Sequence, residues 1–229
     1  MRTREKPRKR TVGWIGTGRM GYEMAARLAK GGADVLVWNR TKEKAAPLTK
    51  HGAKVADNLS ELAPRDIVFC MVSTWKDVKE VITILLAKGK SKPKMVIECS
   101  SISLEGSAEL REILGKHKVQ YLAAPVSGNA KVIKAGKLTF VCSGPKKAYQ
   151  LAEPFLRLIG TNSSYVGEGE LSRIVKICHN VFLGVVTQSL AEITLLAQKA
   201  GVPRHALLEF INRSVMGSTF TRYKTPAFV

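Results

Sequence analysis

The chain has 229 residues, of which 45% are hydrophobic, and a formal net charge of +19. This length and composition allow a sizeable core, in one large domain or two small ones. We expect no membrane span, because no apolar run approaches the roughly 20 residues that cross a bilayer. Residues 1–10 form a basic tail without an apolar segment, which argues against a secretory signal.

The cysteines lie far apart in the sequence and form no C-x-x-C pair. This usage argues against a disulfide framework and against a zinc site, so we expect no metal. It is typical of a reduced protein, and we expect a cytoplasmic location. The four positions are Cys70, Cys99, Cys142 and Cys178.

The strong positive charge attracts anions such as nucleotide phosphates, carboxylates or nucleic acid. No aromatic-rich RNA-binding strand and no helix-turn-helix signature accompanies this charge. Surface lysines that keep the protein soluble are the simpler interpretation, so we do not expect nucleic acid as a partner and keep it as an alternative.

Between residues 11 and 166, short apolar runs alternate with amphipathic stretches. This alternation predicts an α/β domain with a mostly parallel sheet and helices on both faces. The expected strands are residues 12–15, 34–38, 67–72, 95–98, 119–122, 138–142 and 164–166. The expected helices are residues 20–30, 41–51, 77–87, 104–116 and 145–159.

The pattern changes after Gly167, and residues 169–200 predict one long helix. Apolar residues recur there at three- and four-residue steps on more than one face, and Gly201-Val202-Pro203 ends the helix. A second helix is expected over residues 204–212. We therefore predict an all-α domain over residues 167–229, and a homodimer or higher homo-oligomer that packs through helix 169–200.

The glycine-rich sequence Gly16-Thr17-Gly18-Arg19-Met20-Gly21 follows the first strand and opens the first helix. In a dinucleotide site, the first glycine makes the tight turn and the second lets backbone N–H groups approach the pyrophosphate. The third glycine lets helix and strand pack closely, and the helix N-terminus adds partial positive charge. The motif predicts a Rossmann-type domain over residues 11–166, with these six residues against the cofactor.

The end of the second strand indicates which dinucleotide binds. A domain selective for NAD usually has an acid there, which holds the ribose 2′-hydroxyl. This chain has Asn39-Arg40-Thr41 instead. Asn39 and Thr41 can form hydrogen bonds and Arg40 can pair with a 2′-phosphate, so we predict NADP, with NADPH preferred over NADH.

Several further segments carry a family resemblance. The chain resembles the β-hydroxyacid dehydrogenases, a family related to 6-phosphogluconate dehydrogenase that includes 3-hydroxyisobutyrate dehydrogenase and semialdehyde reductases. The resemblance implies that Met71, Val72, Ser73 and Ser101 lie at the nicotinamide end of the cofactor. The matching segments, in the family's order, are residues 12–45, 71–73, 98–101, 124–128 and 175–180.

The same resemblance implies the substrate site. Ser127, Gly128 and the neighbouring Asn129 would hold the carboxylate of a small substrate. Lys176 would be the general acid/base on the substrate oxygen, with Asn180 orienting the substrate or the lysine. Hydride transfer to a carbonyl needs such a proton donor, and burial can lower the pKa of a lysine towards neutrality. Residues four apart, such as these two, project from one helix face.

Several positions depart from the family's pattern. Ala123 stands where an acid is common, Asn129 replaces a glycine, Ser172 stands where many members have glycine, and Glu98 stands where aspartate is usual. Family members also continue past the position of Val229, so we expect an incomplete helical domain.

These observations predict an NADP-dependent oxidoreductase for a small 3-hydroxy acid or the corresponding semialdehyde or 2-oxo acid. One alternative is a non-catalytic Rossmann-fold protein whose basic surface attracts nucleic acid. A further alternative is an imine reductase, which shares the architecture; Lys176 argues against it, because those enzymes generally lack the lysine.

Overall fold

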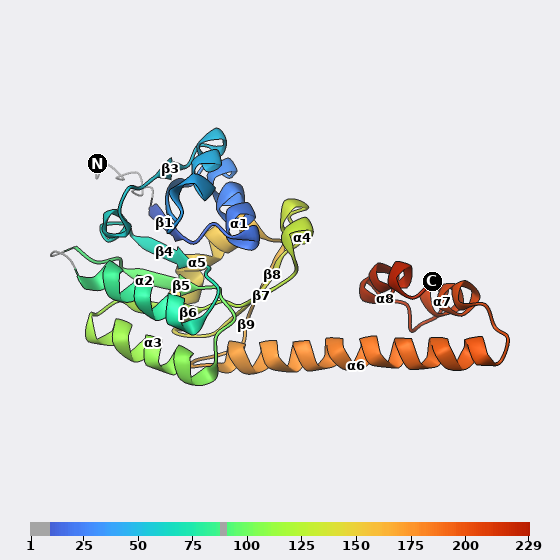
Figure 1. The fold of residues 1–229 in the computed structure, drawn as a ribbon. Coiled ribbons are helices and arrows are strands. Elements are labelled where there is room, and N and C mark those ends of the chain that lie inside the picture. The colour runs from blue at the N-terminus through green and yellow to red at the C-terminus, as the bar shows by residue number, and fades with distance from the viewer. Residues whose placement is uncertain (1–9, 88–90) are drawn as a thin grey trace, which may run out of the picture. The chain divides into compact units, whose positions relative to one another are not determined.

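The computed structural model describes residues 10–87 and 91–229. Residues 1–9 of the predicted basic tail lie outside this part. The chain divides into two compact units, Met1–Lys176 and Ile177–Val229. The division lies inside helix α6 (Leu171–Lys199), which Figure 1 shows as one continuous helix.

The first unit is built on a six-stranded sheet with the order β3-β2-β1-β4-β5-β6, in which all neighbouring strands are parallel. Strand β1 lies between β2 and β4, and Ile15 at its end pairs with both Trp38 and Cys70. The loops that follow these three strands therefore start side by side, at the point where parallel α/β sheets bind nucleotides. The strands are β1 (Thr11–Ile15), β2 (Asp34–Trp38), β3 (Lys54–Val55), β4 (Ile67–Cys70), β5 (Met95–Glu98) and β6 (Gln120–Ala123).

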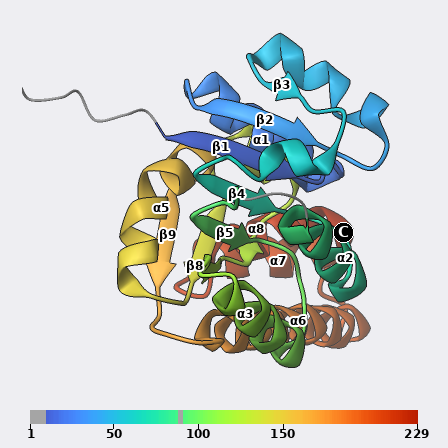
Figure 2. The same cartoon turned by 90° about the vertical axis from the view of Figure 1, so that its left-hand side faces the viewer.

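Helices cover both faces of this sheet, as the sequence predicts (Figure 2). On one face α1 (Arg19–Lys30) and α5 (Lys146–Ile159) pack on a cluster that includes Trp14 and Phe69, whose rings stack with centroids 5.3 Å apart. On the other face α2 (Trp75–Ala87) and α3 (Leu104–Lys116) pack on a second cluster that includes Ile15. Neighbouring residues of β1 thus point to opposite faces, as the alternation of a strand requires.

A second, three-stranded sheet follows in the chain. It contains β7 (Val126–Ser127), β8 (Thr139–Cys142) and β9 (Asn162–Tyr165), with β7 and β8 antiparallel and β8 and β9 parallel. The sequence predicts the last two strands but misses β7, because two residues are too short to show an alternating pattern. The short helix α4 (Ala130–Lys134) lies between β7 and β8 and is also missed.

The predicted α-helix over residues 41–51 is wrong. The structure has two 3₁₀ helices there, η1 (Lys42–Lys44) and η2 (Ala46–His51). Pro47 stands in the first turn of η2 and has no N–H to continue a hydrogen-bonded ladder. A third 3₁₀ helix, η3 (Leu59–Leu62), follows β3.

The second unit contains most of α6, then α7 (Arg204–Arg213), α8 (Thr219–Lys224) and the 3₁₀ helix η4 (Thr225–Ala227). Gly201, with a φ of 88°, follows α6, in agreement with the predicted end of the long helix. Leu190 of α6 and Leu208 of α7 are buried, whereas many other apolar side chains of α6 are exposed.

Within the described residues, α6 is long and apolar enough to cross a membrane, with a mean hydropathy of 1.4 over an 18-residue stretch, of which 11% is buried. This differs from the expected absence of any such segment. The polar residues that interrupt its apolar pattern, such as Asn180 and Gln188, are mostly uncharged and leave the mean high. Length and composition alone are weak evidence for a membrane span.

Candidate functional site

The loop between β1 and α1 is held tightly against the loop after β4. The Gly16 N–H donates to the Trp38 carbonyl at 3.0 Å, and the Met71 N–H donates to the Ile15 carbonyl at 2.9 Å. Gly16 has a φ of +93°, and a Cβ there would lie 2.2 Å from the Met71 carbonyl oxygen. No residue with a side chain can adopt this turn without moving a neighbouring strand end.

The two later glycines of the motif have different surroundings. A Cβ on Gly21 would lie 2.2 Å from the Gly16 carbonyl oxygen, so α1 can approach the loop only because Gly21 lacks one. A Cβ on Gly18 would meet no atom within 4 Å. The first turn of α1 contains no acidic residue, so the open space at Gly18 borders a helix N-terminus that favours anions.

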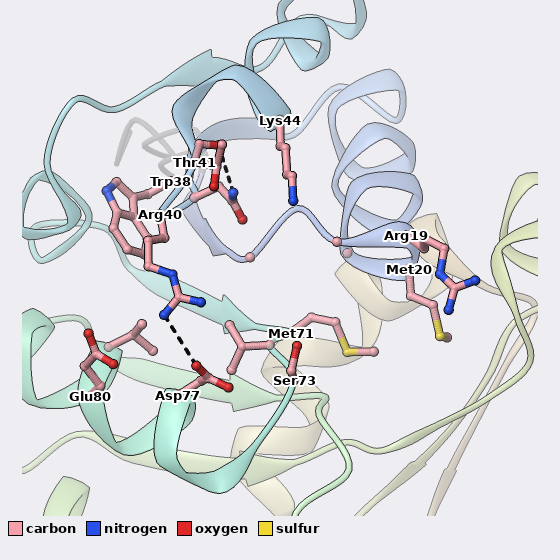
Figure 3. A pocket seen from close by; sticks show the side chains of 16 residues that line it. Arg19, Met20, Trp38, Arg40, Thr41, Lys44, Met71, Ser73, Asp77 and Glu80 are labelled. Carbon is pink, nitrogen blue, oxygen red and sulfur yellow. Dashed lines mark hydrogen bonds and ion pairs between the residues drawn. The ribbon is translucent and has the colours of Figure 1, made fainter.

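A cavity of about 380 Å³ opens above these strand ends. Its lining includes all the predicted cofactor residues except Thr17 and Ser101. Five lining residues were not predicted: Trp38, Lys44, Asp77, Glu80 and Val81. Figure 3 shows the cavity between the loop after β2 and the start of α2.

Asn39 braces the glycine loop. Its Oδ1 accepts a hydrogen bond from the Thr17 N–H at 2.8 Å, and its Nδ2 donates to the Thr41 carbonyl at 2.8 Å. Both ends of the amide therefore fix the backbone around the cavity. The Thr17 hydroxyl is buried beside it and has no hydrogen-bond partner among the described residues.

The cavity carries positive charge on one wall and negative charge on the other (Figure 3). Arg40 and Lys44 come from the segment after β2, and Asp77 and Glu80 come from α2. The Arg40 guanidinium, whose side chain is 76% exposed, lies 3.6 Å from the Asp77 carboxylate. Lys44 lies in the 3₁₀ helix η1, so no α-helical spacing from Arg40 could have identified it in the sequence.

Asp77 also caps the start of α2. The Thr74 hydroxyl donates to the Asp77 carboxylate at 2.6 Å, and the Thr74 N–H donates to it at 3.0 Å. The Thr74 hydroxyl first, and then the Thr74 N–H and Arg40, lower the pKa of Asp77 against the opposing effect of desolvation. The carboxylate that faces Arg40 therefore stays charged.

The predicted substrate loop lies in and after β7. Gly128 has a φ of +143°, and a Cβ there would lie 2.9 Å from side-chain atoms of both Leu138 and Val132. Asn129 caps α4, because its Oδ1 accepts a hydrogen bond from the Val132 N–H at 3.1 Å. Ser127 is partly exposed. Within the described residues, the lining of the cofactor cavity includes none of these three loop residues, Ser127, Gly128 and Asn129.

Lys176 is the last residue of the first unit and lies half-buried in α6, where desolvation lowers the pKa of its ammonium group. Asn180 is exposed and belongs to the second unit, and its Oδ1 lies 3.3 Å from Nδ1 of His179. Both residues are on one helix, as predicted. Across the described residues, no three His, Cys, Asp or Glu side chains cluster closely enough to hold a metal ion.

A buried ion pair at the start of α6 was not predicted. Arg173 and Glu98 are 3% and 0% exposed, and their side chains form a salt bridge. The signal was available in the sequence, because a charged residue that ends the apolar strand β5 needs a partner when it is buried.

Comparisons with known proteins agree with this architecture. The family model for the NAD binding domain of 6-phosphogluconate dehydrogenase matches residues 11–167. Glyoxylate/succinic semialdehyde reductase 2, a chloroplastic protein of Arabidopsis thaliana, is 32% identical over 99% of this chain and 64% of its own length. The chain thus spans less than two thirds of that relative.

Two further comparisons cover more of the other protein. The 3-hydroxyisobutyrate dehydrogenase of Pseudomonas aeruginosa is 30% identical over 90% of this chain and 70% of its own length. The structure of Mycobacterium tuberculosis 3-hydroxyisobutyrate dehydrogenase with L-serine has a TM-score of 0.87 and 27% identity, covering 95% of this chain and 75% of that one.

Proposed function

The chain belongs to the β-hydroxyacid dehydrogenase family, and we propose that it is an NADP-dependent oxidoreductase of small hydroxy acids. It moves a hydride between the nicotinamide and a 3-hydroxy acid, or the corresponding semialdehyde or 2-oxo acid. The observation that carries this proposal is the half-buried Lys176, whose pKa is lowered by desolvation and which belongs to the same compact unit as the cofactor cavity. The family resemblance is what assigns this lysine as the acid/base.

The walls of the cavity support NADP as the cofactor. Arg40 and Lys44 offer two positive charges to a 2′-phosphate, and the three residues directly after β2, Asn39-Arg40-Thr41, include no acid that would hold a ribose 2′-hydroxyl. The open space at Gly18 suits a pyrophosphate at the start of α1. Together these features fit a dinucleotide that carries an extra phosphate.

The substrate class follows from charge and from the relatives. The names of two relatives identify glyoxylate, succinic semialdehyde and 3-hydroxyisobutyrate, which are all small carboxylates. In our proposal Ser127 and the backbone of Gly128 bind the carboxylate of the substrate, beside Asn129. The net positive charge of the chain draws such anions towards it.

Lys176 handles the proton in this mechanism. NADPH, when bound, supplies the hydride. During reduction the Lys176 ammonium donates a proton to the substrate oxygen, and during oxidation the neutral amine accepts one. Asn180 orients the substrate or the lysine.

We further propose that α6 packs against a second copy of the chain. Its exposed apolar side chains include Ile177, Val181, Phe182 and Leu196, which are 50%, 60%, 71% and 70% exposed. An exposed apolar surface of this kind is typical of an interaction site.

The test begins with a fluorescence titration of the protein with NADPH and with NADH, in low and moderate salt. Tight binding of NADPH and weak binding of NADH are expected. Glyoxylate, succinic semialdehyde and 3-hydroxyisobutyrate are then assayed with the wild type and with Lys176→Met, which should bind NADPH normally and lose turnover. Turnover that survives in Lys176→Met would contradict the assigned acid/base. Failure to bind either cofactor would contradict the proposal and favour the non-catalytic alternative.

A further inference from the structure

We propose that the buried Arg173–Glu98 ion pair is a positioning device that ties the first turn of α6 to the loops beside the cofactor cavity and thereby holds Lys176 in place. Its catalytic consequence rests on the proposed function. The anchoring itself concerns only the fold of the first unit, so it can be tested without a substrate.

The Arg173 side chain makes four contacts inside the first unit. One terminal nitrogen donates to the Ser100 carbonyl at 2.7 Å, and the other donates to the Glu98 carboxylate and to the Tyr121 hydroxyl, the latter at 3.2 Å. Nε lies 3.4 Å from the Ser107 hydroxyl. Burial raises the pKa of Tyr121 to about 12, so the phenol stays neutral beside the ion pair.

Ser100 connects this arginine to the cofactor cavity. Its N–H donates to the Glu98 carboxylate at 2.6 Å, and its carbonyl accepts from Arg173. Its hydroxyl accepts from the Val72 N–H at 2.9 Å, and Val72 lines the cavity. Every polar atom of Ser100 is therefore engaged, and the residue next to it is Ser101, which is predicted to contact the nicotinamide.

Lys176 lies one helical turn after Arg173 in α6, so the contacts of Arg173 also fix the position of the lysine backbone. Lys176 follows Arg173 by three residues, which corresponds to a rise of about 4.5 Å along the helix and to nearly the same face. A helix turn is stiff, so a shift of the Arg173 backbone moves Lys176 with it. The network thus joins Val72 on the cavity wall to the proposed acid/base through Ser100 and Arg173.

Three residues that depart from the family's pattern gather at this helix start. Glu98 forms the ion pair, and the Ser172 hydroxyl lies 3.5 Å from the Ala123 carbonyl and 2.8 Å from the Ser143 hydroxyl. The start of α6 is thus held by a set of buried polar contacts. A buried ion pair is a poor device for stability alone, because apolar residues of similar volume are often as stable. A role in fixing geometry accounts better for its presence.

The paired variant Glu98→Gln/Arg173→Met removes both buried charges together, so no unpaired charge remains in the core. The matched control is Arg111→Met/Glu170→Gln. It removes the ion pair between Arg111 Nε of α3 and Glu170 Oε1 at the same helix start, with the two atoms 3.0 Å apart. This pair is solvent-exposed at Arg111 and does not contact Ser100. The variant Ser100→Ala, a small change, breaks only the link to Val72.

The first measurement is amide hydrogen exchange on the full chain without ligand. In the paired variant, exchange of residues 171–176 and of the Val72 amide is expected to quicken at least tenfold, while strand β1 stays as protected as in the wild type. The control is expected to change less than twofold. Ser100→Ala is expected to quicken the Val72 amide alone. Unchanged exchange rates in the folded paired variant, or equal changes in the control, would overturn the proposal. If the paired variant does not fold, an unchanged exchange rate of the Val72 amide in Ser100→Ala would overturn it.

The second measurement separates positioning from a loss of folded protein. In the paired variant, kcat per folded molecule is expected to fall at least tenfold, while the Kd for NADPH changes less than threefold. An unchanged kcat would overturn the catalytic part of the proposal. If the wild type shows no turnover with any carboxylate, the proposed function fails, whereas the exchange experiment still decides whether the network anchors α6.

Discussion

The Arg40 guanidinium lies 3.6 Å from the Asp77 carboxylate across the cavity, so without a cofactor its charged partner is a side chain of the protein itself. The pair is largely exposed at Arg40 and therefore contributes little to stability. A 2′-phosphate offers a second partner that can accept two hydrogen bonds from the same guanidinium. Arg40 is thus free to exchange a weak partner for a stronger one.

We therefore predict that Arg40→Ala weakens NADPH binding by roughly 10- to 100-fold, the effect of losing a charged hydrogen bond, and leaves NADH binding within about threefold. Fluorescence titration with both cofactors measures this. The matched control is Arg157→Ala, which removes a similarly exposed arginine that pairs with Glu153 inside α5. An equal loss of affinity for NADPH and for NADH would show that Arg40 does not bind the 2′-phosphate.

Lys176 should make the rates of both reduction and oxidation depend on pH. Desolvation lowers the pKa of its ammonium group below the usual 10.5. Reduction needs the protonated lysine, so the rate of reduction should fall as the pH rises through the lowered pKa. Oxidation needs the neutral amine, so the rate of oxidation should fall as the pH drops below it. The profiles of kcat/KM against pH for reduction and for oxidation should bend at the same pKa, below 10.5, and Lys176→Met should lose this pH dependence in both directions.

The turn between β1 and α1 shows how far an element could be predicted. The glycine pattern predicts both the turn and the separate task of each glycine, and the positions of Gly16 and Gly21 agree with it. The catalytic assignments came from the family resemblance instead, since nothing in the spacing of Lys176 alone separates it from a surface lysine. The strand β7 and the helix α4 were missed, because two residues show no alternation and five residues span less than two turns of a helix.

Two alanine substitutions in this turn should have opposite effects. Gly18→Ala meets no atom and should leave the free energy of unfolding within about 1 kcal/mol, yet abolish NADPH binding because the methyl group occupies the pyrophosphate's space. Gly21→Ala places a Cβ 2.2 Å from the Gly16 carbonyl and should lower the free energy of unfolding by about 1–3 kcal/mol. Urea unfolding together with NADPH titration distinguishes the two, and a normal Kd for Gly18→Ala would contradict the assigned pyrophosphate site.

Asp66 joins the starts of β1 and β4. Its carboxylate lies 2.8 Å from Lys94 Nζ and accepts from the Thr11 N–H at 3.0 Å, and these contacts, with Lys94 the larger cause, lower its pKa from 3.8 to about 2. A lowered pKa stabilises the folded chain above pH 3.8, and this stabilisation is lost as the pH falls towards 2.

We predict that Asp66→Asn lowers the free energy of unfolding by about 1–2 kcal/mol at pH 6, a value reduced for the exposure of Lys94. The difference from the wild type should shrink towards zero near pH 2. Denaturant unfolding at both pH values measures it, with Asp57→Asn, in an exposed pair with Lys42, as the control that should change little at either pH. A difference that is the same at pH 2 and pH 6 would contradict the assigned contacts.

At the scale of the whole molecule, the sequence predicts a domain boundary between residues 166 and 167, whereas the structure divides the chain after Lys176, inside α6. What the sequence could not supply was the exposure of α6. A helix with apolar residues on several faces is equally compatible with burial inside its own chain, and only the structure shows that Phe182 and Leu196 are about 70% exposed.

The chemistry of this helix favours a second copy as its partner. Residues 177–191 contain no Asp, Glu, Lys or Arg, so the surface offers no charge for a polyanion or a charged peptide to match. An identical apolar helix complements it by two-fold symmetry. We predict that the wild type has a solution mass of at least twice its 25.1 kDa chain, and that Phe182→Glu with Leu196→Glu reduces it to one chain.

Analytical ultracentrifugation measures these masses. Val215→Glu is the matched control, because this residue is 100% exposed outside α6 and its substitution should leave the oligomer intact. Vesicle flotation tests the other occupant that the hydropathy of α6 allows. A wild type that is monomeric in solution and floats with vesicles would contradict the oligomer and assign α6 to a lipid bilayer, whereas an oligomer that stays with the soluble fraction supports the second copy.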